Sequence, residues 1–428
     1  MKKVIILTMV FAMSLMTSGA ALAEATVVGS GTDVGTSLTP GQTSGAQPIV
    51  KVKWEMKGKC FSTDSNYNNC TGVKAIDPTG VTVSGEGLDD NMSLAGAQFN
   101  APGKWGDIMK YTVCAIVTDP NGVGDIDAVY ADIYYPTDRP MHKSSSDPTN
   151  PNYDPDEIDN PSGGCNAFIE QNSLKKLNKD DGIDLFCNWV RVRNNNLPTF
   201  GTYITEDDAV KYEEICNPQT GELPEEEAYV YCDDKTLTWE DPAGNYTVKV
   251  AGHDSDGPGT ALENTFKYNE YTGFEIDFNS IKYQNVIKDV RNQVSGDRNF
   301  DPTASTMPTV RNIGNTRLNM LVAQDDMDFG FRDGNVWNVG YDARVGNKTG
   351  DWHGFYNPFK LKTEAGDPSG IEPEYSRLKE ILNLSETEKM DFVILVNKWS
   401  KGTTFPYSGS MWLDAERAEF GTCVQPSS

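Results

Sequence analysis

The chain is poor in basic residues and in histidine. Its 428 residues include 37 Lys and Arg against 62 Asp and Glu, which gives a formal net charge of −25. A surface this acidic repels nucleic acid and anionic lipid, so we expect no nucleic-acid partner. The three histidines are far apart in the sequence, in polar stretches, and they give little support for a three-His zinc site.

The common catalytic motifs are also missing. The sequence contains no G-x-S-x-G, no H-E-x-x-H and no P-loop. It also lacks C-x-x-C, the motif of thioredoxin chemistry, zinc knuckles and c-type haem attachment. We therefore expect a protein that is not an enzyme and that has no cofactor, with Ca²⁺ as the one alternative left open. A secreted glycan-processing enzyme remains a rival hypothesis, because carboxylate pairs are plentiful in this chain.

Only the N-terminus carries an apolar run of note. Residues 1–23 have a basic start, an apolar centre and a final Ala-Leu-Ala, the pattern of a secretory signal peptide. No later stretch approaches the roughly 18 apolar residues of a spanning helix, so no membrane span is expected. The sequence thus predicts an exported protein, extracellular or on the cell surface.

The cysteine count is even, which in an exported chain favours disulfides. The eight candidates are Cys60, Cys70, Cys114, Cys165, Cys187, Cys216, Cys232 and Cys423. Proximity in the sequence predicts the pairs Cys60–Cys70, Cys165–Cys187 and Cys216–Cys232, which leaves Cys114 and Cys423. Five N-x-S/T sequons make N-glycosylation candidates of Asn69, Asn91, Asn245, Asn347 and Asn383.

Short alternating strands separated by turn residues predict an all-β fold of two β-sandwich domains, immunoglobulin-like or jelly-roll-like. We place a flexible arm or donor strand at 24–47 and a first sandwich at 48–270. A long disulfide-tied insertion interrupts this first sandwich at about 137–230, and a second sandwich follows at 271–428. One short helix is predicted in "EPEYSRLKEILNL" (372–384), and "KMDFVILVNKW" with "YSGSMWLDAE" is predicted to form a hairpin-like pair.

Two groups of segments resemble a known kind of protein. "VTDPNGVGDIDAVYADIYYP" with "DPAGNYTVKVAGHDSDG" resembles immunoglobulin-like modules of exported archaeal proteins. "PTVRNIGNTRLNMLVAQDDM" with "MDFVILVNKW" and "YSGSMWLDA" is similar in style to the surface β-sandwiches of TasA/camelysin-like fibre subunits. The resemblance implies a surface β-sandwich protein and brings no catalytic residue with it.

A cation site is one interpretation of the stretch that begins at Asp119. Asp119, Asn121, Asp125 and Asp127 supply oxygen atoms of the kind that Ca²⁺ binds. The same letters, Asp-Pro-Asn-Gly, also specify a tight turn, and no EF-hand Glu follows at the required place. "AGHDSDGPG", with Asp254 and Asp256, is a second stretch of the same kind. The two interpretations are compatible if the stretch is a structural turn that a bound cation stabilises.

We expect a structural subunit of an extracellular filament, sheath or surface layer, with itself or other surface proteins as partners. The arm at 24–47 is either a disordered linker or a strand donated to a neighbouring subunit. The alternative is a carbohydrate-binding module or adhesin, for which Trp337, Trp352 and Tyr356 are the ligand-facing aromatic candidates; filling of the core is the other interpretation of these rings.

Overall fold

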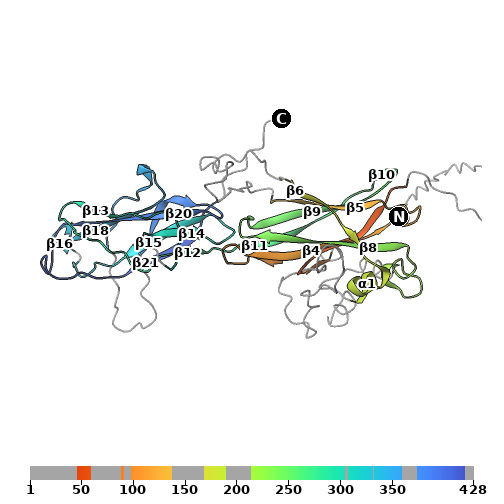
Figure 1. Ribbon diagram of the computed structural model, residues 1–428, viewed down its shortest axis with the longest axis horizontal. Coiled ribbons are helices and arrows are strands. Elements are labelled where there is room, and N and C mark those ends of the chain that lie inside the picture. The colour runs from red at the N-terminus through yellow and green to blue at the C-terminus, as the bar shows by residue number, and fades with distance from the viewer. Residues whose placement is uncertain are drawn as a thin grey trace, which may run out of the picture. The chain divides into compact units, whose positions relative to one another are not determined.

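The computed structural model describes residues 46–58, 88–90, 98–136, 168–188, 214–303, 307–330, 332–358 and 374–419. The regular structure of the described residues is almost entirely β and forms two β-sandwiches, as the sequence predicts (Figure 1). The predicted signal peptide and nearly all of the arm lie outside the described residues, so both remain predictions. None of the helices in the described part of the chain is long and apolar enough to cross a membrane.

The first sandwich consists of two sheets, which we call the β4 sheet and the β9 sheet. The β4 sheet has the order β2 (Leu88–Asp90), β1 (Ile49–Lys57), β4 (Ile108–Thr118), β8 (Ala228–Thr238) and β7 (Lys175–Lys176). The β9 sheet has the order β3 (Gln98–Asn100), β11 (Leu262–Asn269), β9 (Gly244–Asp254), β5 (Ala128–Tyr134) and β6 (Phe168–Ser173), with β10 (Gly257–Pro258) paired to β9. All of these pairings are antiparallel except that of β3 with β11.

The strand order of the first sandwich is that of an immunoglobulin-like domain. Strands β1, β4, β8 and β7 take the positions A, B, E and D, and β5, β9 and β11 take the positions C, F and G. Tyr246 on β9 is fully buried, and its hydroxyl donates a 2.8 Å hydrogen bond to the carbonyl of Pro242. This bond back across the turn before strand F is the tyrosine corner of such folds. The immunoglobulin-like prediction for this domain is confirmed.

The predicted alternation of buried and exposed residues also holds in the β9 sheet. On β5, Val129, Ala131 and Ile133 are buried, and on β9 Tyr246 and Val248 are buried, in one core between the two sheets. The residues between them on each strand are at most partly buried. This is the pattern of strands with one face toward a core.

The β4 sheet is buried on both faces, which the sequence did not predict. Its outer face carries a second apolar cluster that includes Val52, Trp54 and Met56 of β1. The insertion covers this face with helix α1 (Lys179–Ile183), the π-helical turn η2 (Asp184–Asn188) and residues 214–227. Figure 1 shows α1 beside β8, on the side away from β9. The insertion therefore forms a packed outer layer of the first sandwich.

An ion pair lies inside the first sandwich as a consequence of this arrangement. Because the apolar residues of β1 face outward, Lys53 and Glu55 face the interior, where both side chains are fully buried. Lys53 Nζ lies 2.5 Å from Glu55 Oε1 and also donates to Asn264 Oδ1 on β11. The two buried charges thus stabilise each other, and the Lys53 ammonium is also bound by the side-chain amide of Asn264.

The second sandwich also has two sheets, the β20 sheet and the β15 sheet. In the β20 sheet, β20 (Thr387–Val396) pairs with β14 (Thr309–Asn312), β13 (Arg291–Val294) and β18 (Val339–Val345), and β12 (Phe274–Ile276) extends it beyond β14. The β15 sheet has the order β19 (Ser376–Leu382), β15 (Leu318–Gln324) and β21 (Met411–Arg417). A small hairpin of β16 (Arg332–Asp333) and β17 (Val336–Trp337) and the short 3₁₀ helix η3 (Thr349–Asp351) complete the elements of this domain. Its core includes Leu318, Met320 and Val322, which alternate along β15.

Three turns rich in Asp, Asn, Pro and Gly connect strands of opposite sheets. The turn at 119–122 leads from β4 to β5, the turn at 241–244 from β8 to β9, and the turn at 312–315 from β14 to β15. In each case the two flanking strands belong to different sheets of one sandwich. Each turn therefore leads the chain across the sandwich from one sheet to the other, whereas a hairpin turn joins two strands of the same sheet.

Two sequence predictions in the second domain were wrong. Residues 372–384 were predicted as a helix, but 376–382 form strand β19, paired with β15 through an irregular register. Leu378 and Leu382 are four residues apart, a spacing that places both on one side of a helix and equally on one side of a strand. The hairpin predicted between "KMDFVILVNKW" and "YSGSMWLDAE" is also absent, because β20 and β21 lie in different sheets.

Candidate functional site

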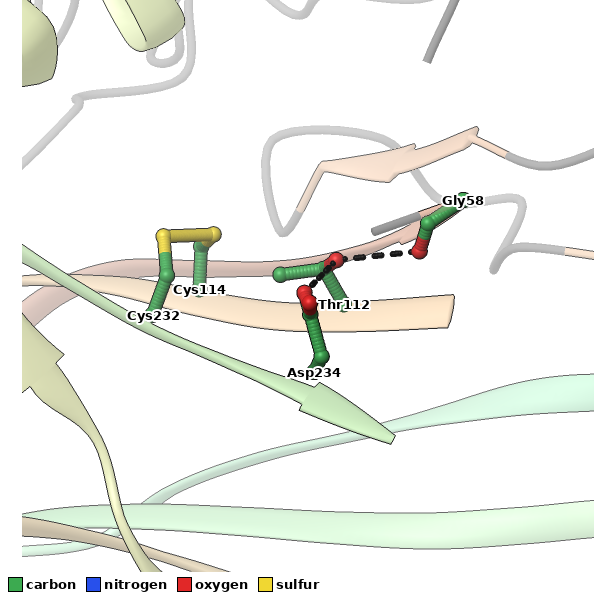
Figure 2. Close-up of a disulfide and its surroundings, with 5 residues drawn as sticks. All are labelled: Gly58, Thr112, Cys114, Cys232 and Asp234. Atoms are coloured by element: carbon green, nitrogen blue, oxygen red, sulfur yellow. Dashed lines mark hydrogen bonds between the residues drawn. A yellow bond between two sulfur atoms is a disulfide. The ribbon is translucent and has the colours of Figure 1, made fainter. Parts of the chain in front are cut away.

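Two disulfides tie the insertion and the sheet that it covers. Cys114 on β4 is bonded to Cys232 on β8, and Cys187 in η2 is bonded to Cys216. All four cysteines belong to the apolar cluster on the outer face of the β4 sheet. Figure 2 shows the first bond beside the Thr112 hydroxyl, which donates to Asp234 Oδ1 at 2.7 Å and lies 3.1 Å from the carbonyl of Gly58.

The predicted pairs Cys165–Cys187 and Cys216–Cys232 are wrong, because Cys187 is bonded to Cys216 and Cys232 to Cys114. Proximity in the sequence failed because antiparallel pairing places Cys114 directly opposite Cys232, 118 residues away. Cys60, Cys70, Cys165 and Cys423 lie outside the described residues, and so does the predicted pair Cys60–Cys70.

Removing the Cys187–Cys216 bond should loosen the outer layer. The bond closes a loop with a sequence separation of 29 residues, for which chain-entropy arguments give a loss of about 3 to 4 kcal/mol in the free energy of unfolding. We expect this loss in the Cys187→Ala/Cys216→Ala double variant, measured by guanidinium unfolding. A loss under about 1 kcal/mol would show that packing alone holds the insertion in place.

The three candidate ligand-facing aromatics do not form one platform. Tyr356 is 7% exposed, belongs to the core and pairs through its backbone with Tyr341, so its prediction as a ligand-facing residue was wrong. Trp352 is partly exposed, but the guanidinium groups of Arg291 and Arg344 lie within 5.0 Å of its ring centre.

Trp337 is likewise partly exposed and has an arginine against its ring. The guanidinium of Arg332, its partner in the β16–β17 hairpin, lies 4.2 Å from the ring centre. Arginine side chains therefore lie against both tryptophan rings and reduce the ring surface that is open to a sugar.

A cavity of about 710 Å³ lies in the second domain between residues 276–284 and the segments around Val294, Pro302 and Pro308. A glycosidase site there would need two carboxylates facing a cleft. The described lining contains one carboxylate, Asp277, whose two oxygens accept hydrogen bonds from the backbone N–H groups of Thr309 and Asp301. The described part of this cavity gives no support to the glycan-processing alternative.

The glycosylation candidates differ in accessibility. Asn245 and Asn347 are exposed and can carry a glycan in the folded protein. Asn383 is 7% exposed, and its Oδ1 accepts a 2.9 Å hydrogen bond from Arg317 Nε, so this site is incompatible with a glycan on the folded chain. Asn69 and Asn91 lie outside the described residues.

A buried polar network surrounds the turn between β19 and β20. Asn312 is fully buried and donates through Nδ2 to the carbonyls of Thr316 and Asn383, both at 2.8 Å. Glu386 accepts a 2.6 Å hydrogen bond from the backbone N–H of Asn383. Burial, together with the charges of Glu388 and Glu380, raises the pKa of Glu386 from 4.5 to about 7.

This pKa predicts that part of the stability depends on pH. Below about pH 4.5 Glu386 is neutral in both the folded and the unfolded chain, and it costs no stability there. Between about pH 4.5 and 7 the unfolded chain ionises while the folded chain keeps the partly buried Glu386 protonated, so stability falls over this range and stays level above it. Glu386→Gln should be more stable than the wild type by about 3 kcal/mol at pH 8 and equal to it at pH 4, measured by denaturant unfolding. An equal difference at both pH values would contradict this assignment.

Strand β21 presents a sheet edge. Among the described strands its one partner is β15, so β21 ends the β15 sheet. Its inward residues Met411, Leu413 and Ala415 pack against the core but are only partly buried, while Met320 and Val322 on the neighbouring strand are fully buried. The core is therefore less well covered at this edge than in the middle of the sheet.

The residues predicted to bind Ca²⁺ lie at the corner between β4 and β5. Asp119 is buried, and its carbonyl accepts a 2.9 Å hydrogen bond from Gly122 N–H, which closes the predicted turn. Asp125 and Asp127 are exposed, and Asn121 donates from Nδ2 to the carbonyl of Ala46 at 3.0 Å. Within the described residues no three His, Cys, Asp or Glu side chains are grouped as a ready-made metal centre.

Comparison with known proteins gives no family. No family model matches the chain, and no curated protein matches it. Among solved structures, the C-terminal domain of the antigen I/II-family protein AspA of Streptococcus pyogenes is 10% identical, with 87% of this chain and 100% of that chain covered and a TM-score of 0.18. The AgI/II polypeptide BspA C-terminal domain of Streptococcus agalactiae is 9% identical, with 81% and 91% covered and a TM-score of 0.16.

A secreted serine protease of Vibrio cholerae, VesC, is 7% identical, with 78% of this chain and 55% of that chain covered and a TM-score of 0.17. TM-scores this low do not establish a shared fold for any of these structures. The archaeal and TasA/camelysin-like resemblance therefore remains a prediction from the sequence.

Proposed function

We propose that the chain is a structural subunit of an extracellular filament, sheath or surface layer, in which the arm at 24–47 of one subunit pairs with β21 of the next. The observation that carries the proposal is the β21 edge, where, among the described strands, a seven-residue strand ends its sheet over a partly exposed core. Exposed edges of this kind recruit further strands through main-chain hydrogen bonds.

The disulfides support the location. Bonds such as Cys114–Cys232 and Cys187–Cys216 are typical of proteins that work outside the reducing cytosol. The strongly acidic composition keeps such a protein soluble until specific contacts form.

The arm has the composition and length for strand addition. It carries Val27, Val28, Val34 and Leu38, whose side chains can cover Met411 and Leu413 while the backbone pairs with the edge. Fully extended, residues 24–47 span about 80 Å, several times the length of β21. The segment therefore has enough chain to leave its own subunit and still pair with the whole edge.

The adhesin alternative has weaker support in the described structure. An aromatic sugar platform needs open ring faces, but arginine side chains lie against Trp337 and Trp352 and Tyr356 belongs to the core. Assembly through a sheet edge needs only backbone groups and apolar cover, both of which β21 offers.

A competition experiment tests the proposal. A synthetic peptide of residues 24–47 added to the full-length protein should occupy β21 edges and shorten or prevent the polymers seen by electron microscopy. A peptide with Val27, Val28, Val34 and Leu38 replaced by Ser is the matched control and should have no effect. If both peptides leave assembly unchanged and neither binds the protein in calorimetry, the arm is not the donated strand.

A further inference from the structure

The fold brings together two acidic stretches that are far apart in the sequence. Asp119 follows β4, and Asp254 is the last residue of β9. Pairing of β5 with β9 aligns Ala128 with His253, and Asp127 N–H donates to the carbonyl of His253 at 2.9 Å. The loop after Asp119 and the turn after Asp254 therefore lie at one end of the β9 sheet.

In each of the two carboxylates, only one oxygen accepts a hydrogen bond. Asp119 Oδ1 accepts a 2.7 Å hydrogen bond from Asn121 N–H, and Asp254 Oδ1 accepts from the N–H groups of Asp256 and Gly257 at 2.8 and 2.9 Å. Asp119 is 5% exposed and Asp254 is 9% exposed. The second oxygen of each carboxylate, Oδ2, is buried and has no hydrogen-bond donor. A buried anionic oxygen without a partner is costly, and a cation is one ligand that removes the cost.

The surrounding charges strengthen the case for a cation. Asp254, Asp125 and Asp256 all lie close enough to Asp119 to add negative potential there.

We propose that Asp119 Oδ2 and Asp254 Oδ2 form the buried half of a Ca²⁺ site, which carbonyl and water oxygens complete. Ca²⁺ accepts an irregular shell of carboxylate, carbonyl and water oxygens, whereas Mg²⁺ demands a tighter octahedron. A site with two fixed carboxylates and an otherwise irregular shell therefore favours Ca²⁺ over Mg²⁺. The ligand set differs from the one predicted from the sequence, since it takes Asp254 from the second stretch and leaves out Asn121, Asp125 and Asp127.

The position of the site gives it a further consequence. The Asn121 side chain, in the Asp119 turn, holds the carbonyl of Ala46, and the carbonyl of Pro48 lies where a Cβ on Gly259 would be. Residues 46–48 thus enter the sandwich between the two acidic loops. A bound cation would therefore fix residues 46–48, where the arm at 24–47 joins the domain. The importance of this effect for assembly rests on the proposed function, whereas cation binding itself does not.

Calorimetry and thermal melting of the full-length protein test the site. After removal of metals with a chelator, CaCl₂ or MgCl₂ is titrated at about 0.15 M salt, which screens unspecific attraction to the acidic surface. We expect one Ca²⁺ per chain, much weaker Mg²⁺ binding, and a melting temperature about 5 °C or more higher at a Ca²⁺ concentration 100 times the Kd.

Matched variants separate this site from other carboxylates. Asn at positions 119 and 254 keeps the Oδ1 acceptors but removes the charge, so Asp119→Asn/Asp254→Asn should lose the Ca²⁺ response while melting at or above the metal-free wild type. Asp333→Asn, an exposed residue of the β16–β17 hairpin, is the control and should respond like the wild type. A wild type that shows neither binding heat nor a shift, or a double variant that keeps the full response, overturns the proposal. Either result can be obtained whether or not the protein polymerises, so failure of this site is distinguishable from failure of the assembly proposal.

Discussion

Deletion of residues 24–47 is expected to abolish polymerisation and to leave both sandwiches folded. The described strands of both cores begin at Ile49 or later, so the deletion removes no strand from either sheet. It removes the segment that we assign to the β21 edge of a neighbour. Electron microscopy and light scattering of the truncated and full-length proteins at equal concentration measure assembly, and thermal melting measures the fold.

The control for this deletion keeps the length of the arm. A full-length variant with Val27, Val28, Val34 and Leu38 changed to Ser should assemble as poorly as the truncated protein, because strand addition also needs the apolar contacts. A truncated protein that still forms the wild-type polymers, or a full-length protein that stays monomeric at high concentration and physiological salt, contradicts the donated-strand proposal.

Lys53→Met is expected to destabilise the first sandwich by about 3 to 5 kcal/mol. The substitution leaves Glu55 fully buried without its cation, and removal of one partner of a buried ion pair carries a cost of this order. The double variant Lys53→Met/Glu55→Leu should recover most of the loss, because two apolar side chains need no compensation. Denaturant unfolding of the wild type and the two variants gives the three free energies.

Lys249→Met is the matched control on the same domain. Lys249 forms a 2.9 Å ion pair with Glu263, but both side chains are more than 40% exposed, and exposed pairs contribute about 0 to 1 kcal/mol. If Lys53→Met costs no more than Lys249→Met, or the double variant is as unstable as the single one, the buried pair does not have the role that its position indicates.

The same strand shows how far the sequence could predict the fold. The alternation of Val52, Trp54 and Met56 correctly predicts a strand, because its period of two is local. It does not reveal which face meets the sandwich interior. The insertion provides a second apolar layer outside the β4 sheet, so the apolar face points outward and the charged face points inward. That choice depends on residues more than 100 positions away.

The disulfide pairing and the proximity of the two acidic stretches could not be predicted from the sequence, for the same reason. Cys114 meets Cys232, and the Asp119 turn meets the turn after Asp254, only through long-range strand pairing. Each acidic stretch looked like a plain turn by itself, since neither contains a complete ligand set. Residues 376–382 were mispredicted for a related reason. The spacing of Leu378 and Leu382 allows a helix and a strand equally, and pairing with β15 makes this segment a strand.

High-resolution electron microscopy of the native material tests the assembly proposal most directly. We predict a polymer in which an extended segment containing Val27, Val28 and Val34 from one subunit lies antiparallel or parallel beside β21 of the next and covers Met411, Leu413 and Ala415. Isolated monomers, or a polymer in which the β21 edge is free and the arm pairs with nothing, would contradict the proposed function.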